Sequence, residues 1–96
     1  MRVRYTPRAR SDIDEIFAYI AKENPEAAQR VRRSIFAAIE LVAARPYLGI
    51  RNARSHDLRS RLVSRYPYRV HYLLRDQEVL ILHIRHAARA PWKAER

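Results

Sequence analysis

Arginine and histidine are concentrated in the second half of this 96-residue chain. Nine of these residues could act together on a negatively charged partner: Arg59, Arg61, Arg65, Arg69, His71, His83, Arg85, His86 and Arg89. Arginine binds phosphate oxygens and stabilises charge that develops on them, and histidine can transfer a proton near neutral pH. The residue types leave two interpretations equally open. One is a metal-independent ribonuclease site, and the other is a basic surface that docks an acidic partner without chemistry.

The net charge supports an acidic partner. The chain carries +10, from 20 Lys and Arg against 10 Asp and Glu. Most of it belongs to residues 45–96, which hold 12 basic and four acidic side chains. Such a field favours nucleic acid or an acidic protein segment. A solvated basic surface without a specific partner is the remaining interpretation, because net charge by itself governs solubility and non-specific binding.

Other kinds of site find little support in the sequence. The chain has no cysteine, which excludes disulfides and thiolate chemistry. His83 and His86 are three apart on a predicted strand and point to opposite faces, and no carboxylate accompanies a cross-strand pair of His71 and His83. We therefore expect no metal and no cofactor. The N-terminus has no apolar signal segment, and no stretch reaches the ~18 apolar residues of a membrane span, so we expect a cytoplasmic protein.

The apolar pattern predicts the elements that must position the basic set. A strand over 2–5 precedes helices over 7–22 and 25–44, which begin at the cap-and-proline pairs Thr6-Pro7 and Asn24-Pro25. A loop over 46–57 holds the only glycine, Gly49, where a special backbone conformation is expected. Strands over 58–65, 68–74 and 78–86 follow, and then an extended tail over 87–96. The length allows one domain over 1–96.

The order β-α-α-β-β-β predicts an α+β fold, an antiparallel sheet with a helical hairpin packed on one face. The other face would be free and rich in arginine. Because Asn-Gly and Asp-Gly are absent, we expect a three-residue turn over 75–77 between the last two strands. That turn would place two sets on the core face: Val70, Tyr72 and Leu74 from one strand, and Leu80, Leu82 and Ile84 from the other. The open face would then show Arg69, His71, His83 and Arg85.

Several motifs in this order are shared with one group of proteins. They are Tyr5-Thr6-Pro7 with Ala9, Asp12-Ile13, Pro46 with Gly49, Asp57-Leu58-Arg59, Tyr68-Arg69-Val70-His71-Tyr72, and the aliphatic strand that ends in His86 and Arg89. With these motifs, nearly the whole chain resembles the ParE/RelE superfamily of bacterial toxins from type II toxin–antitoxin systems. The resemblance implies the RelE/ParE-like α+β fold described above.

The resemblance also implies a partner. A toxin of this kind arrests growth and is neutralised by a cognate acidic antitoxin, here ParD-like, with which it forms a hetero-oligomer. In the family the antitoxin wraps along the helices and the sheet. This implies antitoxin contacts at Ile13, Phe17, Ile20, Ile35 and Ile39.

The superfamily divides by target. RelE-like members cut mRNA on the ribosome, whereas ParE-like members poison DNA gyrase. Arg69 matches a RelE-type arginine and Arg89 lies near a second one, but Trp92 stands near the place of the RelE tyrosine, and only His86 could replace that group. The incomplete acid/base set favours a gyrase inhibitor that is not an enzyme over a ribonuclease that uses Arg69, His86 and Arg89. The implied target-binding residues are Arg59, Arg61, Arg65, Arg69, His71, His83, Arg85, His86, Arg89 and Trp92.

Overall fold

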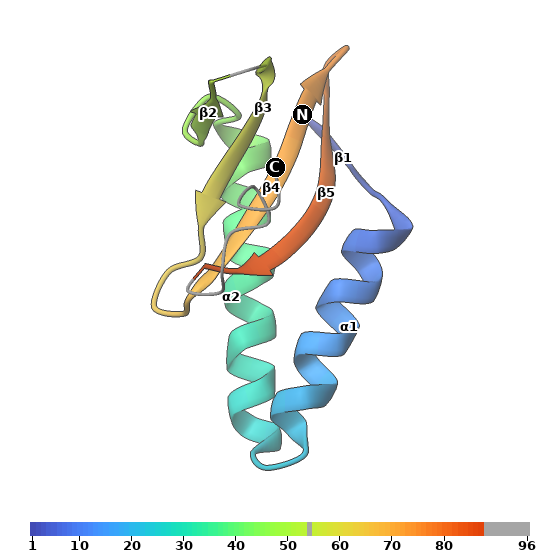
Figure 1. Ribbon diagram of the computed structural model, residues 1–96, viewed down its shortest axis with the longest axis vertical. Coiled ribbons are helices and arrows are strands. Elements are labelled where there is room, and N and C mark those ends of the chain that lie inside the picture. The colour runs from blue at the N-terminus through green and yellow to red at the C-terminus, as the bar shows by residue number, and fades with distance from the viewer. Residues whose placement is uncertain (54, 88–96) are drawn as a thin grey trace.

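Two helices cover one face of a five-stranded sheet (Figure 1). The computed structural model of the protein describes residues 1–53 and 55–87. The elements in chain order are β1 (Arg2–Tyr5), α1 (Pro7–Ala21), α2 (Pro25–Ala44), β2 (Ile50–Asn52), β3 (Ser55–Leu62), β4 (Tyr68–Arg75) and β5 (Glu78–His86). The strands are ordered β1-β5-β4-β3-β2. The predicted α+β class is confirmed, and the tail predicted over 87–96 lies outside the described residues from 88 onward.

Both helices begin where the capping residues predict. Thr6 Oγ1 accepts a hydrogen bond from Ala9 N at 3.0 Å, and Asn24 Oδ1 accepts one from Ala27 N at 3.0 Å. In each helix the proline that follows the cap occupies the first turn, where a missing N–H leaves no acceptor unsatisfied. The two helices are separated by three residues and pack against each other, with α1 beside β5 and α2 behind β3 and β4 (Figure 1).

The sheet is mixed, so the prediction of a purely antiparallel sheet is wrong at one edge. β1 pairs with β5 in parallel, with Val3 opposite Val79 and Tyr5 opposite Ile81. All other neighbouring strands are antiparallel. The physical reason is long-range: the opposite edge is occupied by β2, so β1 adds to the free side of β5, and β5 becomes central as its apolar sequence predicts.

The region between α2 and β4 was also predicted in part incorrectly. The loop expected over 46–57 contains β2, and the strand expected over 58–65 lies over Ser55–Leu62. The chain leaves β3 early because Arg65 has a φ of 75° and Val63 N donates to Tyr68 O, which closes a turn that contains Arg65 and Pro67. A left-handed residue and a proline both interrupt a strand ladder.

Gly49 is needed for space rather than for a special backbone angle, since its φ is not positive. A Cβ at this position would collide with the Tyr72 hydroxyl and would lie 2.8 Å from Ser60 O. The hydroxyl of Tyr72, a fully buried residue, accepts a hydrogen bond from Gly49 N at 3.0 Å and donates one to Pro46 O at 2.7 Å. The central strand β4 therefore holds the loop that leads into β2.

The turn between β4 and β5 has two residues, not the three predicted. Arg75 pairs with Glu78, and Asp76 and Gln77 have φ values of 51° and 67°. These angles suit the two-residue hairpin turn that glycine and asparagine favour. This turn places Val79 and Ile81 in the core in place of the predicted Leu80 and Leu82.

One extra residue in β5 then restores part of the predicted pattern. Tyr72 faces Ile81 and His71 faces His83, so Leu82 has no partner in the ladder and forms a β-bulge. Beyond the bulge, Ile84 is buried opposite Val70. The core therefore contains Val70, Tyr72 and Leu74 from β4 and Val79, Ile81 and Ile84 from β5.

The strained turn gives a test of stability. Gln77→Gly should raise the free energy of unfolding by about 0.5–1 kcal/mol, because relief of the left-handed φ outweighs the added freedom of the unfolded chain. Urea denaturation would measure it. Gln77→Ala removes the same side chain but keeps Cβ, so it should stay within about 0.5 kcal/mol of the parent. Equal stability of the glycine and alanine variants would contradict this account of the turn.

Tyr72→Phe tests the link between β4 and the loop. The substitution keeps the ring but leaves Gly49 N–H and Pro46 C=O without their partner, so it should cost about 1–3 kcal/mol of unfolding free energy. Tyr19→Phe is the matched control, because Tyr19 is 74% exposed and its hydroxyl faces solvent. A loss as large in the control as in Tyr72→Phe would refute the proposed role of the buried hydroxyl.

Candidate functional site

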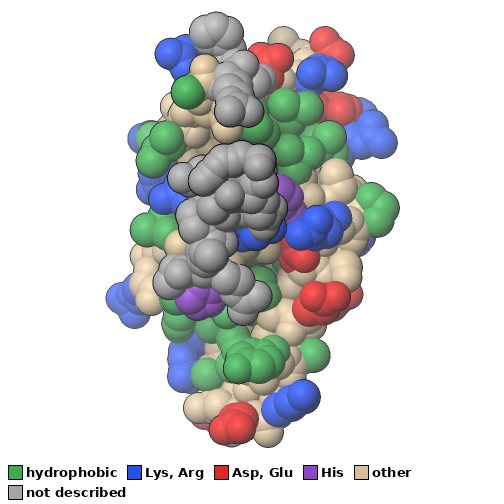
Figure 2. All heavy atoms as spheres, viewed as in Figure 1, with side chains coloured by type: hydrophobic (Ala, Val, Ile, Leu, Met, Phe, Trp, Pro, Cys, Tyr) green, Lys and Arg blue, Asp and Glu red, His purple; other side chains and the backbone are tan. Residues whose placement is uncertain are grey.

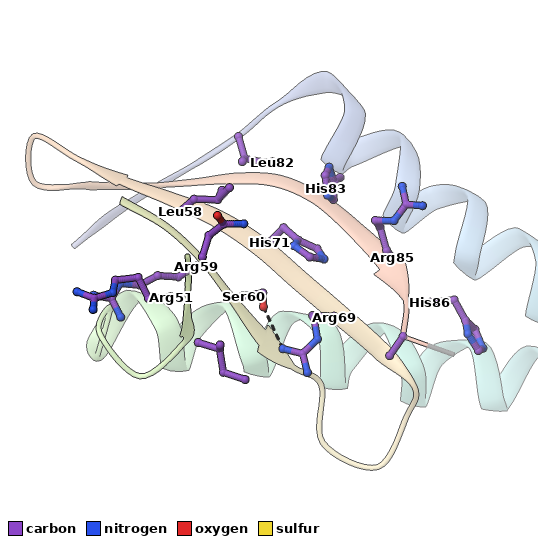
Figure 3. A pocket seen from close by; sticks show the side chains of 13 residues that line it. Arg51, Leu58, Arg59, Ser60, Arg69, His71, Leu82, His83, Arg85 and His86 are labelled. Carbon is purple, nitrogen blue, oxygen red and sulfur yellow. Dashed lines mark hydrogen bonds between the residues drawn. The ribbon is translucent and has the colours of Figure 1, made fainter. Parts of the chain in front are cut away.

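The face of the sheet away from the helices carries a hollow of about 570 Å³ over β2 to β5. We call it the basic groove. It is lined by Ile50, Arg51, Asn52, Leu58, Arg59, Ser60, Arg69, His71, Leu82, His83, Arg85, His86 and Ala87. Figure 3 shows its side chains projecting from neighbouring strands toward the same side. Figure 2 shows Lys and Arg side chains along the margin where β2 and β3 lie and also on the side of α1, where acidic side chains are interspersed with them.

Strand register builds the centre of the groove. Ser60, His71 and His83 face one another across β3, β4 and β5, and Arg69 pairs with Arg85 in the adjacent row. Residues directly opposite on neighbouring strands share a face of the sheet, so these five side chains converge. Arg69 Nη1 donates a hydrogen bond to Ser60 Oγ at 3.0 Å, which holds the guanidinium over the strand (Figure 3).

The rings of the two histidines are in contact, tilted against each other. Their ring centroids are 4.6 Å apart with planes tilted by 53°. The pKa of His71 is lowered from 6.5 to about 4, mainly by burial, with smaller effects in the same direction from the charges of His83, Arg69 and Arg85. Burial is also the main cause of the lowered pKa of His83, where Arg8 and Arg85 add to the effect and Asp12 opposes it. Both rings are therefore neutral at pH 7, and the positive charge of the groove comes from arginine.

His86 lies at the end of β5, apart from this pair. It is opposite Tyr68, and the two rings meet edge to face at 5.3 Å. It also borders a smaller hollow with Arg8, Asp12 and Arg85. His86 thus lines the end of the groove but does not belong to the row of Ser60, His71 and His83.

Three of the predicted target-binding residues, Arg59, Arg61 and Arg65, lie away from the centre of the groove. Arg59 and Arg61 lie opposite the core residues Tyr72 and Val70, which assigns them to the helix-covered face. The Arg59 guanidinium donates to the carbonyls of Tyr47 and Gly49 at 3.3 and 3.1 Å and lies 5.0 Å from the Tyr47 ring centroid. Arg59 nevertheless lines the groove at its β2 and β3 side, where its guanidinium is bound to the loop before β2.

Arg65 lies in the turn after β3, outside the basic groove. Arg89 and Trp92 lie outside the described residues. The described part of the predicted target-binding set therefore converges at Arg69, His71, His83 and Arg85, with His86 beside them.

Seven of the lining residues are absent from the predicted site: Ile50, Arg51, Asn52, Leu58, Ser60, Leu82 and Ala87. Ser60 alternates with Arg59 and Arg61 in a predicted strand, so the period-2 pattern could have placed it beside His71. Leu82 was assigned to the core, and no local signal shows that it starts a bulge. Within residues 1–53 and 55–87, no three His, Cys, Asp or Glu side chains form a cluster that could hold a metal ion.

The predicted antitoxin contacts need correction. Ile13, Ile35 and Ile39 are 5%, 1% and 2% exposed and pack between the helices and the sheet. They cannot contact a partner directly while the fold is intact. These isoleucines belong to the apolar stripe that an amphipathic helix buries. Because this stripe packs on the chain's own sheet, it is not a free surface for a partner. Phe17 and Ile20 are half-buried, and Arg32 lies 5.3 Å from the Phe17 ring centroid.

The architecture is shared with bacterial toxins of known structure. The chain superposes on a structure of the chromosomal ParDE toxin–antitoxin system from P. aeruginosa with a TM-score of 0.77 at 22% identity, covering 90% of this chain and 95% of that one. It also superposes on the isolated E. coli RelE toxin with a TM-score of 0.70 at 15% identity, covering 98% and 92%. At these identities the likeness shows the fold, which is that of the ParE and RelE toxins.

Sequence comparison identifies the family. Residues 3–91 match the family described as the ParE toxin of the type II toxin–antitoxin system parDE, and the chain belongs to this family. The chain is 38% identical to the Y4kP protein of Sinorhizobium fredii over 86 residues, which cover 90% of this chain and 88% of that protein. It is also 38% identical to toxin RelE2 of Caulobacter vibrioides over 88 residues, which cover 92% and 97%. The protein is thus a toxin of the ParE/RelE superfamily, and membership implies an antitoxin partner.

The buried histidines make stability depend on pH. Between pH 6.5 and about 4 the unfolded chain protonates His71 while the folded protein does not, so the unfolded state binds more protons and folding weakens as pH falls. The melting temperature should be constant above pH 6.5 and fall below it. His71→Gln should reduce that fall, whereas Arg75→Gln, at an exposed position, should retain it. An unchanged pH profile in His71→Gln would contradict the assignment.

Proposed function

We propose that this toxin arrests growth by inhibiting DNA gyrase in the cytoplasm and that it does so by binding, without catalysis. The basic groove supplies the contact surface, with Arg69, His71, His83 and Arg85 at its centre. Membership of the family described as the ParE toxin of parDE, over residues 3–91, is consistent with this proposal.

The observation that carries the proposal is the placement of the histidine pair, whose rings lie 4.6 Å apart and partly buried beside Arg69 and Arg85. A general base works best when its pKa lies near the operating pH. His71, with a pKa of about 4, and His83, whose pKa is lowered as well, are poor proton acceptors at pH 7. Arginine remains protonated and does not serve as a base. The centre of the groove, formed by this pair and the two arginines, is therefore better suited to holding acidic groups than to moving protons.

A ribosome-dependent mRNA endoribonuclease is the second candidate. The row of Ser60, His71 and His83 beside Arg69 and Arg85 combines hydroxyl, imidazole and guanidinium groups in one hollow. Those are the groups that a metal-independent ribonuclease uses. In the ribonuclease predicted from the sequence, Arg69, His86 and Arg89 carry the reaction. Arg69 and His86 both line the groove, and Arg89 lies outside the described residues.

The antitoxin proposal follows from charge and exposure. The net charge of +10 favours an acidic antitoxin of the ParD kind. Of the contacts implied by the family resemblance, Phe17 and Ile20 remain as candidates on α1, and Tyr19 between them is 74% exposed. We propose that an amphipathic acidic segment contacts this part of α1.

Gyrase assays with the host's own enzyme test the main proposal. The purified toxin should stabilise cleaved gyrase–DNA complexes. Arg69→Ala and Arg85→Ala should each weaken this effect about 10- to 100-fold, since a charge-assisted hydrogen bond contributes about 1.5–3 kcal/mol. Arg75→Ala is the matched control, because it removes an arginine at the turn of the same hairpin, outside the groove.

The same variants separate the two candidates. Codon-dependent mRNA cuts in arrested cells, lost in Arg69→Ala and accompanied by no trapped gyrase complexes, would establish the ribonuclease and exclude gyrase as the target. Intact transcripts in arrested cells would exclude the ribonuclease.

A further inference from the structure

The β-bulge at Leu82 decides which side chains of β5 reach the basic groove. Side chains alternate between the two faces of a strand, so one extra residue reverses every assignment beyond it. Val79 and Ile81 face the core. Continued without a bulge, the same alternation would turn His83 and Arg85 into the core and expose Ile84. With the bulge, Ile84 is buried, and His83 and Arg85 face His71 and Arg69.

The start of α1 bonds to the backbone on both sides of this bulge. Thr6 N donates to Ile81 O at 3.1 Å, and Thr6 Oγ1 donates to Leu82 O at 2.7 Å. Asp12 Oδ2 accepts from Ile84 N at 3.0 Å. Bulges interrupt the ladder and leave backbone groups that need other partners. Thr6 and Asp12 supply those partners from outside the sheet.

Both side chains are well suited to this role. The Thr6 hydroxyl donates to Leu82 O and accepts from Ala9 N, so one group caps the helix and holds the strand. The Asp12 side chain is 14% exposed, and its other oxygen accepts from Arg8 Nε at 3.4 Å. A carboxylate that accepts a backbone N–H makes a stronger hydrogen bond than a neutral acceptor does.

We propose that Thr6 and Asp12 are positioning residues that hold the Leu82 bulge and thereby keep His83 and Arg85 in the basic groove. Because burying Arg85 in the core would be costly, loss of these contacts should loosen residues 82–86 from the sheet without inverting them. The structural part of the proposal stands alone. Its consequence for toxicity rests on the proposed function of the groove.

NMR on the full chain tests the structural part. Thr6→Val and Asp12→Ala should each lose the ring-to-ring NOE between His71 and His83. Thr6→Ser keeps the hydroxyl, and Asp12→Asn keeps an oxygen that can accept the Ile84 N–H. Both variants should therefore retain the NOE. In Thr6→Val, where Asp12 is still present, the pKa of His83 should rise toward its usual value as burial decreases.

Two controls separate positioning from general stability. Asn24→Ala removes the cap of α2 and should lower the melting temperature without changing the histidine NOE. Asp14→Ala removes an exposed acid from the same helix as Asp12 and should change neither. If Thr6→Val and Asp12→Ala lower the melting temperature but keep the NOE and the His83 titration of the parent, the proposal is wrong.

The gyrase assay measures the functional consequence. Thr6→Val and Asp12→Ala should weaken gyrase trapping at least as much as Arg85→Ala, and Thr6→Ser should restore it. Full trapping by Thr6→Val in a protein that has lost the histidine NOE would overturn the link between bulge and function. A parent toxin that traps no gyrase would contradict the proposed function alone, because the NMR measurements do not involve the target.

Discussion

The alternation of side chains along β5 is the constraint on which the groove and the core both depend. This strand must present apolar side chains to the helices and basic side chains to the open face. A shift of one residue in its register would exchange the two sets of side chains between the faces. The bulge at Leu82 lets Val79, Ile81 and Ile84 all face the core, although their spacing changes from two to three residues. Because the contacts that hold the bulge come from α1, the helix that covers one face of the sheet also determines what the other face presents.

The electrostatics of the open face follow from this placement. Two imidazoles lie against each other, partly buried and beside Arg69 and Arg85, so a further positive charge is unfavourable there. The result is a surface whose arginines are charged and whose histidines are neutral at pH 7. Such a surface attracts acidic groups, and its histidine pair has little capacity to accept a proton, which is the physical basis of the proposal that the groove binds its target without catalysis.

The opposite end of the sheet depends on a different contact. The buried hydroxyl of Tyr72 binds both Pro46 and Gly49, and Arg59 binds the same loop from β3. These bonds direct the chain from α2 into β2, which forms one wall of the groove. Arg59, which the sequence predicts as a target contact, therefore also has a structural role, whereas Arg61 pairs with the core residue Val70 and does not line the groove.

The sequence by itself determined the helices, the α+β class, the family and the presence of arginine and histidine on the last two strands. These features depend on local signals: the caps at Thr6 and Asn24, the helical period, and alternation over 68–72. Only the tertiary structure decided the parallel pairing of β1, the short strand β2, the burial of Ile13, Ile35 and Ile39, and the convergence of Ser60, His71 and His83. Each of these depends on contacts between residues far apart in the chain. The clearest case is the bulge at Leu82, since its partners, Thr6 and Asp12, lie about 70 residues earlier and no local pattern connects them.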